Sequence, residues 1–258
     1  MIGCIIQARM GSSRLPGKVM MELDRGKSVL DYVMDQLSFS RLIDKKIIAT
    51  TDLEQDDVIE QTADRLNYEC FRGSAENVLD RYYQCSKKYH INNILRITSD
   101  CPIIDPQIVD KVIEMYLTGK YDYVSNTLVK TFPAGTDVEI FSFELLEKAW
   151  KNGTLSSEKE HVTPHIRNRK IDCRLGNLEN TNDESHFRWT LDRSEDLELI
   201  KQIIKNIDKK PILLKHILNL LSKKPELVKI NAHIHPNEGM LKSLKRDDEE
   251  KNQYEKTN

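Results

Sequence analysis

Short apolar runs alternate with longer amphipathic segments over roughly the first 120 residues of the chain. The short runs predict buried strands, which we place at 2–6, 46–50, 68–71 and 93–97. Apolar residues at helical spacing fill the segments around them and predict helices over 28–38, 54–67, 75–89 and 106–119. Regular strand–helix alternation is typical of a parallel sheet covered on both faces. We therefore predict an α/β fold, with a three-layer, mostly parallel sheet.

This rhythm changes after about residue 120. Residues 121–141 predict strands joined by a loop, and later strands are expected at 170–175 and 187–191. Further helices are expected at 142–152, 156–168, 194–207 and 211–223. The segment 226–258 is charged and poor in apolar residues, so we expect a partly disordered tail after a domain that spans 1–225.

Composition limits the classes of partner. The 258 residues carry 39 basic and 41 acidic side chains, so no global field draws the protein to nucleic acid or to an anionic membrane. Any site for an anion must be local. The five cysteines form no CxxC pair, which favours free thiols in a reducing cytoplasm. We expect a cytoplasmic protein without a signal peptide or a membrane span.

The stretch IIQARMGSSRLPGK (5–18) joins the end of the first predicted strand to a small, basic loop. In such sheets, ligands bind beyond the carboxyl ends of the strands, where this loop begins. The loop has neither Walker A nor GxGxxG spacing. Its backbone amides and its cations Arg9, Arg14 and Lys18 still suit a phosphate group. By charge alone, a solvated basic turn is an equal alternative.

Two aspartates follow other predicted strands. Asp100 comes after the strand at 93–97, and Asp192 comes after the one at 187–191. Two carboxylates beside a phosphate loop would form a Mg²⁺ site, in which the metal bridges carboxylate and phosphate. Each aspartate alone is equally well explained as a turn or helix-capping residue. Their combination with the basic loop favours the metal site.

The loop resembles the opening motif of the cytidylyltransferases that make CMP-activated sugar acids, such as CMP-Kdo, CMP-sialate and CMP-pseudaminate synthetases. The chain is most similar to the branch that includes the spore coat polysaccharide protein SpsF. The resemblance covers roughly residues 1–220. Six further motifs carry it in order: IIATTD (47–52), FRGSAENVLDRY (71–82), RITSDCPIIDP (96–106), FPAGTDVEIF (132–141), EHVTPHI (160–166) and RWTLDRSEDL (188–197).

This resemblance implies a nucleotide-binding α/β core (1–120), an inserted dimerisation and acceptor lobe (121–190) and closing helices (191–225). It implies transfer of CMP from CTP to an acceptor with release of pyrophosphate, Mg²⁺ as cofactor, and a homodimer. Catalytic residues would be Arg14, Lys18, Asp100 and Asp192, of which Asp100 and Asp192 would hold the metal. The residues expected to bind CTP are Gln7, Ala8, Arg9, Ser12, Arg14, Lys18, Arg72, Gly73, Asn77, Arg81 and Ser99. Those expected near the acceptor are Gly135, Asp137, Glu139, His161 and Arg188.

Several alternatives stay open. The acceptor of the family reaction can be a sugar acid in cell-surface or spore-coat polysaccharide synthesis, a phosphorylated polyol or a phosphonate. A UTP- or dTTP-dependent sugar-1-phosphate nucleotidyltransferase is a second candidate, although such enzymes usually have a glycine-richer opening loop. A glycosyltransferase of the related fold needs a DxD-like metal motif, which the sequence Asp-Cys-Pro at 100–102 does not provide. A catalytically silent nucleotide-binding partner would be expected to lack Lys18 or a metal carboxylate. Glu139 and His161 are candidates for a general base.

Overall fold

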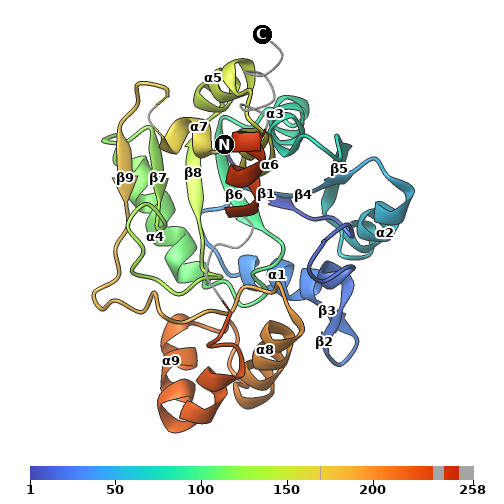
Figure 1. Cartoon of the computed structure of the whole chain (residues 1–258), viewed down its shortest axis with the longest axis vertical. Coiled ribbons are helices and arrows are strands. Elements are labelled where there is room, and N and C mark those ends of the chain that lie inside the picture. The colour runs from blue at the N-terminus through green and yellow to red at the C-terminus, as the bar shows by residue number, and fades with distance from the viewer. Residues whose placement is uncertain (169, 235–240, 250–258) are drawn as a thin grey trace.

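The computed structural model describes residues 1–168, 170–234 and 241–249. Its central feature is a seven-stranded sheet in the order β5-β4-β1-β6-β8-β7-β9 (Figure 1). The strands are β1 (Ile2–Gln7), β4 (Lys45–Thr51), β5 (Glu69–Gly73), β6 (Asn93–Thr98), β7 (Tyr123–Ser125), β8 (Glu139–Ser142) and β9 (Leu175–Asn177). A separate two-stranded sheet pairs β2 (Glu22–Asp24) with β3 (Lys27–Ser28).

The sheet is mostly parallel. β1 pairs in parallel with β4 on one side and with β6 on the other, while β8 runs antiparallel to both β6 and β7. The chain builds outward from β1 to β4 and β5, and then returns to place β6 on the other side of β1. Connections from the carboxyl ends of β1 and β6 therefore diverge, which opens a crevice at this switch point.

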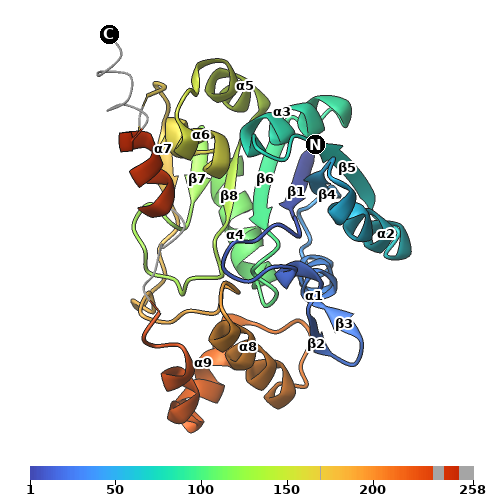
Figure 2. The same ribbon diagram turned by 45° about the vertical axis from the view of Figure 1, so that its right-hand side comes forward.

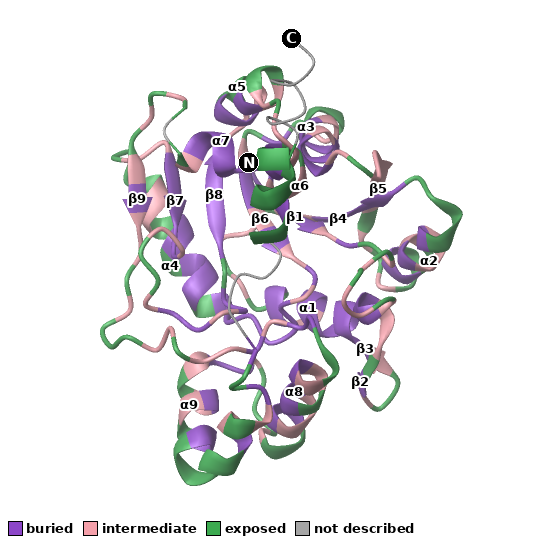
Figure 3. Cartoon of the chain, viewed as in Figure 1, coloured by how far each residue is buried: buried purple, intermediate pink, exposed green. Residues whose placement is uncertain are grey.

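Helices cover both faces of the sheet, as Figures 1 and 2 show. One face packs against α1 (Val29–Leu37), α2 (Asp57–Arg65) and α4 (Pro106–Leu117). The other packs against α3 (Val78–Lys88), α5 (Phe143–Asn152) and α7 (Pro164–Arg167), and α6 (Ser156–His161) lies against α3. Successive β1 residues alternate between these layers: Cys4 and Ile6 join the first, and Ile5 the second. Burial on both faces (Figure 3) explains why the strand has no polar side chain before Gln7 at its end.

A third apolar cluster lies at the carboxyl-end side of the sheet. It is built from α8 (Ser194–Asn206), α9 (Leu214–Lys223) and η3 (Pro225–Ile230), which pack against α1 and the buried Trp189 (Figure 2). A further helix covers 241–249 and lies beside α6. Charge and low hydropathy gave no indication of this helix, and the rest of the tail after 234 lies outside the described residues. No helix in the described ranges is long and apolar enough to cross a membrane.

The alternating pattern of the first 120 residues is confirmed, with element ends shifted by a few residues. Four local expectations were wrong or missing. The single helix expected at 156–168 is two, α6 and α7, with a break at Val162. Residues 187–191 form only a single bridge, between Ala134 and Arg188, because they cross a loop rather than a strand. The strand expected at 170–175 begins at Leu175. The β2–β3 hairpin was not predicted, because the strands on either side of its turn, Arg25-Gly26, are too short to show a pattern.

Gly135 marks a close approach of two backbones. Its φ is +102°, and a Cβ placed there would lie 2.6 Å from the backbone nitrogen of Thr190. Any side chain would therefore separate the loop after β7 from the segment that leads to Asp192. The family resemblance implied a place near the acceptor for Gly135, and the structure gives it this packing requirement.

We expect Gly135→Ala to lower the free energy of unfolding by about 2–4 kcal/mol, because strained backbone and steric overlap act together. Gly119→Ala is the matched control. Its φ is +71°, but a Cβ there meets nothing within 4 Å, so only about 1 kcal/mol should be lost. Urea denaturation measures both values. Equal losses for the two variants would show that the close approach contributes nothing.

Candidate active site

The loop after β1 is held by buried hydrogen bonds at its start. The backbone nitrogen of Met10 donates to Asp56 Oδ1 at 2.6 Å, and Asp56 is fully buried. The loop closes on itself where Gly17 donates to the Met10 carbonyl at 2.9 Å, with Gly17 at φ +71°. These contacts fix the loop at the carboxyl end of β1 and direct the 3₁₀-helical turn η1 (Lys18–Met20) inward.

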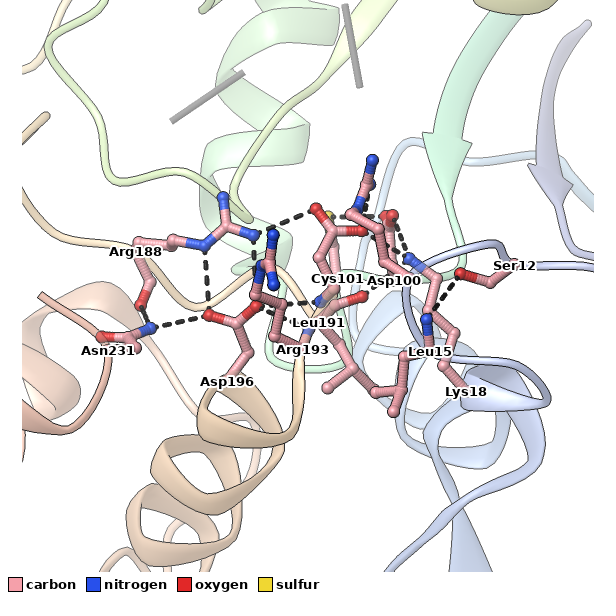
Figure 4. Close-up of polar contacts among 12 residues, drawn as sticks. Ser12, Leu15, Lys18, Asp100, Cys101, Arg188, Leu191, Arg193, Asp196 and Asn231 are labelled. Carbon is pink, nitrogen blue, oxygen red and sulfur yellow. Dashed lines mark hydrogen bonds and ion pairs between the residues drawn. The ribbon is translucent and has the colours of Figure 1, made fainter. Parts of the chain in front are cut away.

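Lys18 joins the loop to both predicted metal-binding aspartates. Its ammonium donates to Asp100 Oδ2 and Asp192 Oδ1, each at 2.9 Å, and to the Leu191 carbonyl at 2.7 Å (Figure 4). Burial alone would lower the pKa of Lys18, but the two carboxylates outweigh this effect and raise it. The lysine is therefore a buried cation with its charge balanced on two sides.

Asp192 is surrounded by cations. Besides Lys18, it pairs with Arg14 through Oδ1 and with Arg188 through Oδ2. Burial would raise the pKa of Asp192, but Lys18 and Arg14 hold it well below the usual range. Arg188 itself is anchored by Asp196, whose carboxylate also accepts from the backbone nitrogens of 192 and 193. Arg188 therefore positions Asp192 from behind.

The two aspartates suit a divalent metal in their chemistry. Asp100 and Asp192 present carboxylate oxygens to a common point, which the Lys18 ammonium now neutralises. Hard oxygen donors of this kind are the ligands that Mg²⁺ prefers, and Mg²⁺ usually takes one or two carboxylates with phosphate and water. Within the described ranges, no group of three or more His, Cys, Asp or Glu side chains is arranged to hold a metal. The donor set thus fits a metal that is completed by a phosphate ligand.

A cavity of about 740 Å³ opens in front of Lys18. This volume is within the range of small-molecule sites. Its lining is strongly cationic, since it includes eight basic side chains and only Glu76, Asp100 and Glu160 as acids. The basic residues are Arg9, Arg14, Lys18, Arg81, Arg96, Lys159, Lys242 and Arg246.

Arg81 and Gln7 leave polar atoms without partners in this cavity wall. Arg81 is 1% exposed, and its Nε and Nη1 have no hydrogen-bond partner among the described residues. Burial lowers the pKa of Arg81 to about 10, which still leaves it charged at neutral pH. Gln7 Oε1 is also buried and unpaired at the end of β1. Unpaired groups of this kind are costly unless a ligand satisfies them.

Glu139 is held in a buried network behind Arg96. It forms an ion pair with Arg96 and accepts hydrogen bonds from Tyr123 and Thr163. Burial would raise its pKa, but Arg96 and Arg167 reverse this and lower the pKa of Glu139 to about 2. Glu139 is therefore ionised and occupied, and it positions Arg96 at the cavity wall.

His161 reaches the cavity from the end of α6 through a strained turn. Val162, which follows it, has φ +69° and ψ −52°, and Thr163 donates to the His161 carbonyl at 2.8 Å. This is a γ-turn with positive φ, which is rare for a β-branched residue. Burial lowers the pKa of His161 to about 4, so its ring is neutral at pH 7. The ring Nε2 lies 2.9 Å from Ser243 Oγ of the helix 241–249.

The cavity includes most of the residues expected to bind CTP. Arg72, Gly73 and Asn77 are outside its lining: Arg72 pairs with Asp57 and Glu60 of α2, and Asn77 caps α3. Among the expected acceptor residues, His161 alone lines the cavity within the described part of the chain. Of all the predicted site residues, those that line the cavity are Gln7, Ala8, Arg9, Ser12, Arg14, Lys18, Arg81, Ser99, Asp100 and His161. Gly135, Asp137, Glu139, Arg188 and Asp192 contribute no lining surface.

Some of the cavity residues gave no signal in the sequence. Arg96 lies inside strand β6, within the motif RITSDCPIIDP, and nothing in the sequence indicated that its side chain faces a cavity. Lys159 and Glu160 precede the EHVTPHI histidines, and Lys242 and Arg246 belong to the charged tail. These two pairs are far apart in the sequence, and the packing of the C-terminal helix on α6 brings them to one cavity.

A family model described as "Cytidylyltransferase" matches residues 3–228, which is most of the chain. The protein therefore belongs to the cytidylyltransferase family and is a nucleotidyltransferase enzyme. The match to the family model ends at residue 228, before the helix 241–249.

Relatives support this assignment. The chain is 35% identical to an uncharacterized protein of Methanocaldococcus jannaschii, covering 89% of this chain and 94% of that protein. It is 33% identical to the spore coat polysaccharide biosynthesis protein SpsF of Bacillus subtilis, covering 86% and 94%. A solved cytidylyltransferase from Leptospira borgpetersenii is 33% identical, with a TM-score of 0.84 over 88% of this chain and 96% of that one.

His161 predicts how stability depends on pH. The unfolded chain binds a proton on this ring near its ordinary pKa of 6.5, whereas the folded protein binds it only near 4. The unfolded state therefore holds more protons between these values, and stability falls as the pH is lowered from 6.5 towards 4. Glu139, with its pKa lowered from 4.5 to about 2, adds a loss below pH 4.5.

We expect His161→Gln to flatten the fall in unfolding free energy between pH 6.5 and 4.5, measured by urea denaturation at several pH values. His90→Asn is the control, because His90 is exposed and Asn tolerates its positive φ of 52°. That variant should keep the wild-type slope. An unchanged slope in His161→Gln would contradict the assignment.

Proposed function

We propose that the protein transfers CMP from CTP to a small sugar acid and releases pyrophosphate. The single observation that supports this most strongly is the Lys18 bridge between Asp100 and Asp192, beside a cationic cavity that Lys18 and Asp100 line. The name of the relative SpsF, and the name 3-deoxy-manno-octulosonate cytidylyltransferase carried by relatives that match 45% of this chain, point to sugar-acid acceptors in polysaccharide synthesis.

The basic loop would hold the triphosphate. Arg9, Arg14 and Lys18 can neutralise its charge, and the amides around Ser12 can donate to phosphate oxygens. The acceptor hydroxyl gives its proton to solvent, and its oxygen attacks the α-phosphorus as the bond to the β-phosphate breaks. Pyrophosphate leaves with the bonding electrons. Arg14 and Lys18 stabilise that leaving group. Positioning and charge neutralisation thus supply most of the catalysis.

The nucleoside would lie against the start of α3. The unpaired Arg81 Nε and Nη1 are donors, and Gln7 Oε1 is an acceptor, at the same cavity wall. The O2 carbonyl and ring N3 of cytosine can accept from the arginine, and its exocyclic amine can donate to the glutamine. Ala8 and Ser99 leave room beside them. We assign the base and ribose to this wall.

Mg²⁺ would be held by Asp100 and Asp192 and, when bound, would neutralise phosphate charge and polarise the α-phosphate. For this to happen, Lys18 must exchange one carboxylate for a phosphate oxygen, which its long side chain permits. The acceptor would lie towards His161, because Glu139 is already occupied by Arg96. We further propose a homodimer that works in the cytoplasm on a cell-surface or spore-coat precursor.

The direct test is pyrophosphate release with CTP, MgCl₂ and a panel of sugar acids, phosphorylated polyols and phosphonates. We expect turnover with one acceptor class, and loss of at least about 100-fold in kcat for Asp100→Asn, because one metal carboxylate is lost. UTP and dTTP replace CTP as controls for the nucleotide. The proposal fails if no acceptor is converted and CTP does not raise the melting temperature more than UTP does.

Arg81 and Arg72 provide a matched pair of arginines for the nucleotide site. We expect Arg81→Met to weaken CTP binding by about 10- to 100-fold, because charge-assisted hydrogen bonds are lost. The same change should raise the melting temperature of the free enzyme, since an unpaired buried charge is removed. Arg72→Met should leave CTP affinity within about two-fold and lower stability, because Arg72 pairs with Asp57 and Glu60.

Calorimetric titration with CTP and MgCl₂, together with thermal melts, separates the two variants. A larger loss of CTP affinity for Arg72→Met than for Arg81→Met would reverse the assignment of the nucleoside wall.

A further inference from the structure

The helix 241–249 is docked on α6 by buried polar contacts. Asp247 Oδ1 accepts from the Ser157 backbone nitrogen at 2.9 Å, and Ser243 Oγ donates to Glu160 Oε2 at 2.7 Å. Ser243 and Asp247 are 1% and 3% exposed. They stand one helical turn apart, so they form a single row that faces α6. This helix therefore belongs to the folded domain.

The neighbouring row of the same helix faces the cavity. Lys242 and Arg246 are also one turn apart, and both line the cavity beside Lys159 and His161. Lys242 makes no hydrogen bond or ion pair with any described residue, and Arg246 approaches Glu160 only at 3.6 Å. The helix thus adds two cations with few ion-pair partners to a cavity in which Arg9, Arg14 and Lys18 are proposed to bind the triphosphate.

The position of this row matches the acceptor side of the cavity. Ser243 hydrogen-bonds to the ring of His161, and the charge of Arg96 lies close enough to lower the pKa of that ring. Arg9 is the one loop cation that approaches this region among the described ion pairs, through Glu160 at 3.8 Å. Arg14 and Lys18 instead face Asp192. Arg14 and Lys18 are therefore directed to one end of the cavity, while Arg9 and Arg246 both approach Glu160 at the other.

We propose that Lys242 and Arg246 bind the anionic group of the acceptor. This inference rests on the proposed function and assigns its second substrate an acidic group, either carboxylate or phosphate. It places a determinant of acceptor specificity in a helix beyond residue 228, where the family match ends. Two adjacent cations, one of them an arginine fork, suit a planar carboxylate or a phosphate oxygen pair.

The test uses the full chain saturated with CTP and CaCl₂, which we use in place of MgCl₂ to slow turnover, and calorimetric titration with two probes. One probe is 3-deoxy-manno-octulosonate, whose only anion is a carboxylate, and the other is glycerol 3-phosphate. We expect one of them to bind the wild type, and Lys242→Gln/Arg246→Gln to weaken that binding at least about 10-fold. The probe that binds identifies the acidic group.

Lys245→Gln is the control for loss of a positive charge on the same helix, because Lys245 is exposed and outside the cavity lining. This variant should keep its affinity for the probe and its affinity for CTP within about two-fold of the wild-type values. Arg246→Lys, which keeps the positive charge, should bind the probe more tightly than the double variant does. A melting temperature equal to that of the wild type shows that the helix is still docked in each variant.

The inference is overturned if the double variant binds the probe as the wild type does, if its CTP affinity falls by the same factor, or if neither probe binds the CTP-loaded wild type. Failure of the proposed function would look different. In that case pyrophosphate release would be absent with every acceptor, whatever the outcome of the titrations.

Discussion

The site depends on one buried ammonium group. Lys18 ties the loop after β1 to the loop after β6 through Asp100, and to the segment before α8 through Asp192 and the Leu191 carbonyl. Without this cation, two carboxylates would face each other in a partly buried crevice, and their repulsion would drive the segments apart. The same bridge closes the third apolar cluster onto the sheet. One residue therefore links the basic loop after β1, the two proposed metal ligands and the packing of α8.

This arrangement explains how a nearly neutral chain forms a strongly cationic cavity. Carboxylates lie behind the site, where Asp196 anchors Arg188 and Glu139 anchors Arg96. Arg96 itself lines the cavity, while Arg188 holds Asp192, which in turn pairs with the cavity-lining Lys18. Because each carboxylate is already paired, its negative charge fixes a cation in place instead of opposing the ligand. The field is local, preorganised and consistent with a polyanionic substrate.

The sequence predicted the sheet, its covering helices and the loop–aspartate core of the site, because these depend on local periodicity and on strand ends. It could not predict which motif residues face inward. Arg72 and Arg81 belong to one motif, yet Arg72 turns to the carboxylates of α2 while Arg81 is buried at the cavity. The C-terminal helix was missed for a similar reason. Its buried face consists of Ser243 and Asp247, which are polar, and apolar periodicity detects only apolar faces.

A helix that docks through polar residues separates two requirements in this enzyme. In the proposed reaction the chemistry rests on Lys18, Asp100 and Asp192, which all fall within the residues 3–228 that the family model matches. Recognition of a particular acceptor needs side chains that vary without disturbing that core. Lys242 and Arg246 meet this condition, since they reach the cavity from a short helix held by few contacts. Changing them alters the charge at one end of the cavity and leaves the Lys18 bridge intact.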